Sequence, residues 1–530
     1  MISIVPLIIA LVPSQGTWTH AGGTCARNAL ASTPLPDIAQ ASWTRSVDQF
    51  GNVITFRYQS TPIVNRTHVF VLGAVRPAGF TQDVFKCFAI RRDTGEVAWA
   101  TTLPTPVAAL GSQSSAALSE RLGVLYVPAN NTITALRASD GVQLWQATLP
   151  RTIVNASPCV TDDLAANRLF ITDYDFDIAG APGSLHCINL DATTPANPFT
   201  PGQNVWSYPI QGLSGNSPAY LPKRMGGPRS SSGAPLVFVA TAGSPDIEPG
   251  RVLAFDAAAN ESPTPVWEVS NSIPQGFFGG VGVSIGPSGR AEVMASSYAF
   301  FDQANTLRID AASGAVISDL ATNRSGVVPI ALRNAISGSS TFAPIVMSTG
   351  YDGFGSVPSL ELLARDTTGM SMVWNSWTAA ALRIGGWNHQ PAATLTRGKH
   401  LLVTGTIAAN ANTNPAQGLK IIDLTLPPSN PNFAMQGNAL AGGSVAIAGL
   451  NIFSVGSAGL CEFGPSWTKA DIDANATIAT ADVYQWETNW QSNSGPRDVD
   501  GDAVFSMHDR ETLLDWIRSD ERTALMGVRP

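Results

Sequence analysis

Short apolar runs alternate with glycine-containing turns along most of the chain. Residues 84–103 read VFKCFAIRRDTGEVAWATTL, and residues 132–149 read TITALRASDGVQLWQATL. Each segment holds an apolar run, a tight turn with glycine and a second run that carries tryptophan. Runs of this kind, rich in β-branched and aromatic residues and bounded by turn residues, predict β-strands. Weaker copies of the same unit end at Trp206, Trp267 and Trp374.

The recurrence of this unit predicts the fold class. A strand–turn–strand unit repeated about every 40–60 residues over about 400 residues is typical of a β-propeller, in which four-stranded blades stack in a ring. We count eight units, which predicts an all-β, eight-bladed propeller over residues 41–463, and a seven-bladed ring is the alternative. The repeated tryptophans are expected to pack between neighbouring blades, because they share the period of the repeat.

The last unit, at residues 441–463, has no tryptophan strand of its own. Residues 41–49, which read ASWTRSVDQ, supply such a strand with Trp43 in the matching place. An N-terminal strand that completes the C-terminal blade closes the ring and leaves no exposed sheet edge. We therefore predict that Trp43 belongs to the last blade.

The sequence of the strand–turn–strand unit resembles a known repeat. FAIRRDTGEVAW and ALRASDGVQLW are similar to the repeat of pyrroloquinoline-quinone-type (PQQ-like) propellers, which has an apolar strand, a turn with Thr-Gly and a tryptophan. The resemblance extends over residues 41–463 and implies a central channel that takes a ligand, here unknown. In quinoprotein dehydrogenases of this type, the channel holds the quinone and calcium, often beside a disulfide of adjacent cysteines. No two of the five cysteines are adjacent here, so the residues do not support PQQ as a cofactor.

Two short acidic segments follow the repeats. Residues 471–482 read DIDANATIATAD, and residues 498–509 read DVDGDAVFSMHD. Counted from the first aspartate, oxygen-bearing side chains lie at positions 1, 3 and 5 and a carboxylate lies at position 12, which is the spacing of a calcium-binding loop. Such a loop supplies the oxygen ligands that calcium prefers from alternate side chains and one carbonyl. The predicted Ca²⁺ ligands are Asp471, Asp473, Asn475, the Thr477 carbonyl, Asp482, Asp498, Asp500, Asp502, the Val504 carbonyl and Asp509.

Each of these loops leads into a helix-like stretch. Two loop–helix units in tandem, with aspartate at position 12, resemble a type I dockerin. The resemblance implies a small α-helical domain over residues 471–530, after a linker at 464–470, that attaches to a cohesin-like or other protein partner. Position 6, normally glycine, is Ala476 in one loop and Ala503 in the other. This predicts weak calcium affinity, because the turn needs a positive φ, and a degenerate loop that binds no metal is the alternative.

The charge of the chain is concentrated in this tail. The formal net charge is −8, and residues 471–530 hold 12 acidic and 5 basic side chains, a net −7. The rest of the chain is therefore almost neutral. Neither part offers the basic face that phosphates need, which argues against nucleic acid as a partner.

The first residues of the chain are apolar. Residues 1–12 read MISIVPLIIALV, which is too short to span a bilayer but suits the core of a signal peptide. We predict a leader over residues 1–24 and a secreted or cell-envelope location, extracellular or periplasmic; a buried N-terminal strand is the alternative. No later segment reaches membrane length, so no membrane span is expected.

HExxH and a phosphate-binding loop, two motifs of catalytic sites, are absent from the sequence. The sharpest polar cluster is residues 383–389, and a hydrogen-bonded structural role is favoured for its His389. We therefore predict a secreted, non-catalytic propeller that binds a partner or polymer and attaches through a calcium-dependent, dockerin-like tail. The alternative is a quinone-dependent dehydrogenase or a polysaccharide-active enzyme targeted by the same tail. An outer-membrane assembly scaffold is less favoured, because Cys25 does not lie in a lipobox.

Overall fold

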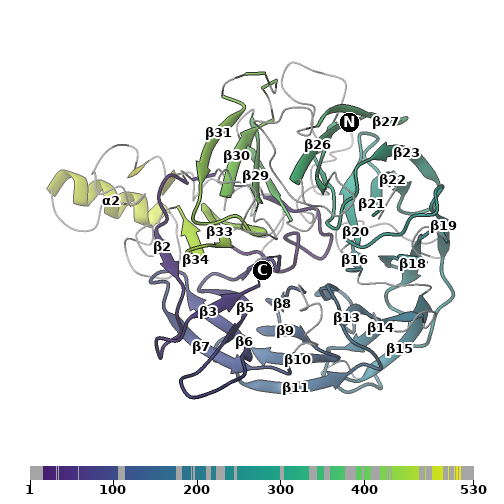
Figure 1. The fold of residues 1–530 in the computed structure, drawn as a ribbon, viewed down its shortest axis with the longest axis horizontal. Coiled ribbons are helices and arrows are strands. Elements are labelled where there is room, and N and C mark those ends of the chain that lie inside the picture. Colours follow the sequence, from purple (N-terminus) through teal and green to yellow (C-terminus); the bar gives the residue numbers. More distant parts are fainter. Residues whose placement is uncertain are drawn as a thin grey trace.

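The structure, a computed structural model, describes most of the chain between residues 16 and 464 and parts of the C-terminal segment (Figure 1). In the C-terminal segment it describes residues 472, 480–492, 499, 507, 509–510 and 513–514. Between residues 16 and 464 it leaves out residues 32, 34, 37, 58, 106–113, 175–181, 193, 195–196, 211–215, 222–232, 244–247, 299–303, 333–342, 351–357, 376–389, 397–398, 407–417, 425, 428 and 431.

Consecutive strands pair antiparallel into sheets that stand around a common centre, as Figure 1 shows. Sheet 1 holds β3 (Ile54–Phe56), β4 (Ile63–Val64), β5 (His68–Val75), β6 (Val84–Arg91) and β7 (Val97–Thr102). Sheet 2 holds β8 (Ala117–Ser119), β9 (Val124–Ala129), β10 (Thr132–Arg137) and β11 (Gln143–Thr148). Sheet 3 holds β12 (Cys159–Val160), β13 (Arg168–Asp173), β14 (Gly183–Asn189) and β15 (Asn204–Ile210). Sheet 4 holds β16 (Ala219–Tyr220), β17 (Leu236–Ala240), β18 (Arg251–Asp256) and β19 (Trp267–Ser270).

The second half of the ring repeats this arrangement. Sheet 5 holds β20 (Val281–Ile285), β21 (Ala291–Ser296), β22 (Ala304–Asp310) and β23 (Val316–Thr322). Sheet 6 holds β24 (Ile330–Ala331), β25 (Ala343–Gly350), β26 (Pro358–Arg365) and β27 (Met370–Asn375). Sheet 7 holds β28 (Ala392–Thr396), β29 (Lys399–Thr406), β30 (Gly418–Asp423) and β31 (Ala434–Asn438), with β1 (Leu30–Ala31) parallel to β28. Sheet 8 holds β32 (Val445–Ala448), β33 (Asn451–Gly456), β34 (Gly459–Phe463) and β2 (Trp43–Arg45).

The described strands thus form eight sheets, as many as the repeat units of the sequence, and the all-β propeller is confirmed. Strands in the middle of a sheet, such as β9 and β17, are buried along their whole length. The outermost strands, such as β11, keep one side open to solvent. This gradient follows from the ring, because each sheet is covered on both faces by its neighbours and meets water at its outer edge.

The N-terminal strand closes the ring, as the sequence predicts. Strand β2 pairs antiparallel with β34, and Trp43 lies opposite Glu462. The amide of Ser42 extends the ladder by donating to the Glu462 carbonyl at 2.8 Å. The two ends of the repeat region therefore share sheet 8, and the outer edge of β34 is covered.

The repeated tryptophans pack on the turn of the next sheet. Trp99 of β7 lies against Gly141, in the turn between β10 and β11, and its Nε1 donates to the Ala138 carbonyl at 3.2 Å. A Cβ at Gly141 would lie 2.5 Å from the Trp99 ring, and Gly141 has a φ of +72°. The period of the sequence therefore reflects one contact, made between each outer strand and the following turn. The same pairing of ring and glycine occurs at Trp43–Gly95, Trp145–Gly202 and Trp267–Gly314.

Replacing Gly141 by alanine is expected to lower the free energy of unfolding by about 2–4 kcal/mol, because the added Cβ meets Trp99 and the positive φ disfavours alanine. Gly123 provides a matched control, since its φ is +63° but nothing lies within 4 Å of an added Cβ. Gly123→Ala should show the backbone cost alone, about 1 kcal/mol. Denaturant unfolding of both variants measures the difference, and equal losses would contradict the packing role of Gly141.

The C-terminal segment contains helix α2 (Thr480–Ser492), which lies outside the ring beside sheet 8 in Figure 1. Its apolar side packs in a small core made of Leu450, Ile472, Val483, Trp486, Val499 and Leu513. Leu450 belongs to the turn between β32 and β33, so this core joins the C-terminal segment to the ring. Among the described residues, no helix is long and apolar enough to cross a membrane.

Candidate functional site

Residues 16–31, which we call the inner segment, lie in the middle of the ring. The segment is drawn in dark purple in Figure 1. It contacts β4 of sheet 1 and then the first strand of each of sheets 2–7, in chain order. The hydrogen bonds, each 2.8–3.2 Å long, join Trp18 to Val64, the Thr19 carbonyl to Leu118 N, His20 Nε2 to Val160 N, the Cys25 carbonyl to Tyr220 N, the Ala26 carbonyl to Val283 N, Asn28 to Ala331 and the Ala29 carbonyl to Ala393 N.

Arg27 anchors the inner segment through backbone carbonyls. Its guanidinium is 2% exposed and donates to the carbonyls of Ser157 at 2.6 Å, Pro158 at 3.0 Å and Pro218 at 2.5 Å. These acceptors precede the first strands of sheets 3 and 4. Burial lowers the pKa of Arg27 to about 10, so the side chain keeps its charge at neutral pH.

His20 lies beside sheet 3, where it is neutral. Burial and the nearby Arg27 lower the pKa of His20 to about 3. Its Nε2 accepts the Val160 N–H, so Nδ1 carries the proton, 2.9 Å from the Thr19 hydroxyl. The ring therefore holds one fixed tautomer, which suits a structural role.

Arg92 connects the inner segment to the closing sheet. It is buried and donates to the carbonyls of Gly16 at 2.7 Å and Ala448 at 2.9 Å and to Asn451 Oδ1 at 3.1 Å. Its guanidinium also lies 5.2 Å from the centre of the Phe453 ring. Sheets 1 and 8 and the start of the inner segment thus meet at one cation.

A buried carboxyl beside this junction predicts a pH dependence. Burial raises the pKa of Glu462 to about 8, although the charge of Arg92 acts against the rise. Such a carboxyl binds more protons in the folded chain than in the unfolded one, so stability that is complete below about pH 4.5 is lost as the pH rises towards 8. We expect the melting temperature to fall from pH 6 to pH 8.5, and Glu462→Gln to reduce that fall. Glu268→Gln, at an exposed pair with Arg251, is the control; an equal fall in both variants would contradict the assignment.

The middle of the ring does not fit the quinone site that the resemblance implies. There the inner segment replaces an open channel with backbone and with the buried side chains of Trp18, His20 and Arg27. All five cysteines are free thiols, and the described residues contain no group of three or more His, Cys, Asp or Glu side chains that would hold a metal. The expectation of an unknown ligand in a central channel stays a prediction; among the described residues, the inner segment lies in this place and completes the hydrogen bonding of the first strands. His389 and its neighbours lie outside the described residues.

The two predicted calcium loops share one feature that the structure describes in both. In the first loop, the amide of Ile472 donates to Asp482 Oδ1 at 2.7 Å. In the second loop, the amide of Val499 donates to Asp509 Oδ1 at 2.7 Å. Both carboxylates are fully buried and occupy position 12, and both amides belong to position 2. Each position-12 carboxylate therefore closes its loop in the same way.

The helices that follow the loops are tied to each other. Arg510, which follows the second loop, donates from Nη2 to Glu487 of α2 at 2.7 Å. Within α2, Trp486 stacks on Trp490 with ring centres 5.1 Å apart. The remaining predicted ligands, and with them the rest of the coordination geometry, lie outside the described residues: Asp471, Asp473, Asn475, Thr477, Asp498, Asp500, Asp502 and Val504.

The comparisons with known proteins support the repeat family and the fold. Residues 42–258 match the sequence model of the family described as outer membrane protein assembly factor BamB. The repeats in residues 42–258 are therefore similar to those of this family. No curated protein matches the sequence. The matched range covers the closing strand β2, sheets 1–3 and the first three strands of sheet 4, and sheets 5–8 continue the same architecture.

Solved structures resemble the chain in fold. A europium-containing methanol dehydrogenase matches with a TM-score of 0.52 and 11% identity over 84% of this chain and 90% of that one. BamB from Moraxella catarrhalis matches with a TM-score of 0.47 and 11% identity over 80% and 96%. A quinohemoprotein alcohol dehydrogenase from Pseudomonas putida matches with a TM-score of 0.49 and 13% identity over 86% and 76%. At these identities, the methanol dehydrogenase supports the quinoprotein-like propeller fold and nothing beyond it. The dockerin-like nature of the tail stays a prediction.

Sequence reasoning did not find the residues of the inner segment. Arg27 and His20 lie in the stretch THAGGTCARNALA, which has no strand period and no turn-bounded apolar run. The signal that was present is a lone arginine and a lone histidine in a weakly charged stretch next to the first repeat. Their partners are backbone carbonyls and amides of distant sheets, and such groups cannot be recognised from residue types because every residue has them.

Proposed function

We propose that this protein is a secreted or cell-envelope propeller without catalytic activity, which binds a partner and attaches through calcium-dependent, dockerin-like loops to a cohesin-like protein. The observation that carries the attachment is the repeated closure of both loops by Asp482 and Asp509. Two loops 27 residues apart that bury the same carboxylate on the same amide indicate one duplicated module.

Calcium has a physical reason to act on this module. Each loop gathers four acidic or amide side chains around a short turn, and at neutral pH their charges repel in the absence of a cation. A cation that binds the closed loops and not the open ones stabilises the closed form by mass action. Magnesium substitutes poorly, because it prefers a stricter octahedron and keeps its waters.

The absence of catalysis is supported by the middle of the ring. The inner segment takes up the place where quinoprotein dehydrogenases hold their cofactor, and most of its hydrogen bonds join it to backbone groups of the surrounding sheets. Residues 42–258 match a family that is described as an outer membrane protein assembly factor, and this match supports a binding role at or beyond the cell envelope. The alternative, a quinone-dependent or polysaccharide-active enzyme, is favoured by the likeness to the methanol dehydrogenase fold.

One set of assays on the full chain tests both parts of the proposal. Calorimetric titration with calcium is expected to show binding, and immobilised chain is expected to retain purified type I cohesin modules with calcium and release them with chelator. Incubation with PQQ, calcium, an alcohol or sugar and an artificial electron acceptor is expected to give no turnover. Turnover would overturn the non-catalytic assignment. The absence of calcium binding at millimolar concentration would overturn the attachment.

A further inference from the structure

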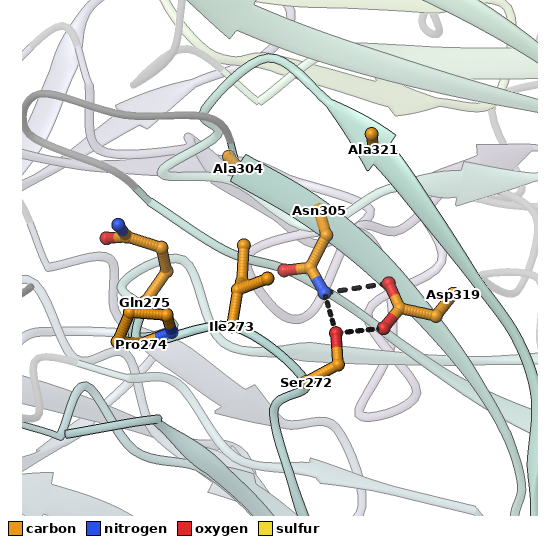
Figure 2. Close-up of a pocket in the computed structure, with 8 residues that line it drawn as sticks. All are labelled: Ser272, Ile273, Pro274, Gln275, Ala304, Asn305, Asp319 and Ala321. Carbon is orange, nitrogen blue, oxygen red and sulfur yellow. Dashed lines mark hydrogen bonds between the residues drawn. The ribbon is translucent and has the colours of Figure 1, made fainter.

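A pocket of about 420 Å³ opens on the ring between sheets 4 and 5 (Figure 2). One wall is the segment that follows β19, with Ser272, Ile273 and Pro274. The other wall is formed by the paired strands β22 and β23, with Asn305 near the start of β22 and Asp319 in the middle of β23. The volume is in the range of sites that bind small molecules or single side chains with their flanking backbone.

The polar wall holds one carboxylate in a fixed position. Asn305 is buried, and its Nδ2 donates to Asp319 Oδ1 at 2.7 Å, while the Ser272 hydroxyl donates to Asp319 Oδ2. Asn305 is itself held by Asn271, which accepts from Nδ2 at 2.7 Å, and by the Ser297 hydroxyl, which donates to Oδ1 at 2.7 Å. Figure 2 shows Ser272, Asn305 and Asp319 as a closed triangle at one side of the pocket.

The charge of Asp319 is not neutralised by these contacts. Both of its oxygens accept from uncharged donors, and within the described residues no Lys or Arg forms an ion pair with it. The cations of the neighbouring strands are occupied elsewhere: Arg308 pairs with Glu292 at 2.7 Å, and Arg324 lies over the Tyr298 ring. A carboxylate has about four acceptor positions, so two remain for a ligand.

The remaining lining is apolar. Ile273 and Pro274 form the wall opposite Asp319, and Ala304 and Ala321 lie above it in Figure 2. A ligand that fits this arrangement carries N–H donors and a positive charge at one end and a hydrocarbon stem behind it. An arginine side chain has both parts, and its planar fork matches a carboxylate better than the point charge of an ammonium does.

We propose that this pocket binds an arginine side chain of a partner polypeptide, with the guanidinium on Asp319 and the methylene stem along Ile273 and Pro274. The charge of Asp319, which has only uncharged donors around it, favours a positively charged side chain of the partner over a neutral one. The pocket gives the propeller a ligand class, and it is separate from the calcium loops, so failure of either assignment leaves the other open to its own test.

The test uses the full chain and N-acetyl-arginine methylamide, followed by ligand-observed NMR and calorimetry. We expect millimolar binding that weakens with salt, and binding about tenfold weaker for the citrulline analogue, which is neutral and nearly the same shape. Asp319→Asn is expected to weaken binding of the arginine compound by about tenfold. Asp83→Asn, at an exposed pair with Arg76, is the control and is expected to leave binding unchanged.

A second variant keeps the test independent of the Asn305 network. Ala321→Lys adds an ammonium at an exposed lining position, where it can occupy Asp319, and it is expected to block the arginine compound. Equal binding of the citrulline and arginine compounds, or unchanged binding in both variants, would overturn the proposal. Binding of methyl glucoside in place of the arginine compound would overturn it in favour of a neutral polyol site.

Discussion

Replacing Arg27 by methionine is expected to lower the free energy of unfolding by about 3–5 kcal/mol. The guanidinium satisfies carbonyls of Ser157, Pro158 and Pro218, which lie at the entrances to sheets 3 and 4. Methionine has the length of the stem and none of the donors, so these carbonyls would be left buried without partners. The inner segment would lose its hydrogen bonds to the entrances of sheets 3 and 4, and these two sheets would no longer share a hydrogen-bond donor.

Thermal and denaturant unfolding of the full chain measure this effect. Arg290→Met is the matched control, because the Arg290 side chain is 79% exposed and lies 3.9 Å from its partner carboxylate. Its effect is expected to stay within about 0.5 kcal/mol. Equal stability of the Arg27 and Arg290 variants would mean that the inner segment contributes nothing to the ring.

The inner segment also bears on the predicted leader. Removal of residues 1–24 would take away Trp18 and His20, which are buried against sheets 1 and 3. A cut before residue 16 would leave every contact of the inner segment intact. The leader over residues 1–24 stays a prediction, and residues 16–24 of that range belong to the inner segment.

The ring was predictable because its signals are local and repeated. The apolar runs, the turn glycines and the tryptophans follow from the packing of one blade on the next, as at Trp99 and Gly141. Even the closure by Trp43 could be deduced, since the last unit lacks a tryptophan strand and residues 41–49 contain one. Contacts that recur with the period of the repeat leave a pattern that a single sequence reveals.

Contacts that do not recur leave no such pattern. The inner segment meets seven sheets with about one hydrogen bond each, mostly through its backbone, so no period marks it. The pocket joins Ser272, Asn305 and Asp319, which are separated by more than a strand in sequence and are ordinary polar residues there. Only the pairing of β22 with β23 and the path of the chain after β19 bring them together.

The calcium loops lie between these two cases. Their spacing was visible because liganding oxygens must alternate along a tight loop. The burial of Asp482 and Asp509 on the amides of position 2 was not visible, because it depends on how each loop closes over the core of Trp486 and Leu513. This contact gives position 12 a structural role besides the predicted metal role, and substitutions can separate the two.

Asp509→Asn is expected to abolish calcium binding at the second loop while leaving the loop folded, because the asparagine oxygen still accepts the Val499 amide and the charge is gone. Asp509→Ala loses both the charge and the acceptor for the Val499 amide. It is expected to destabilise the C-terminal unit by a further ~1–3 kcal/mol, which is the cost of one unsatisfied buried amide. The same two substitutions at Asp482 should reduce calcium binding less than those at Asp509, since the second loop keeps Gly501 and a full set of aspartates. Calorimetry gives the calcium affinity, and hydrogen exchange at Val499 reports loop closure. Wild-type calcium binding by Asp509→Asn would show that the carboxylate serves the fold alone and that the second loop is not a metal site.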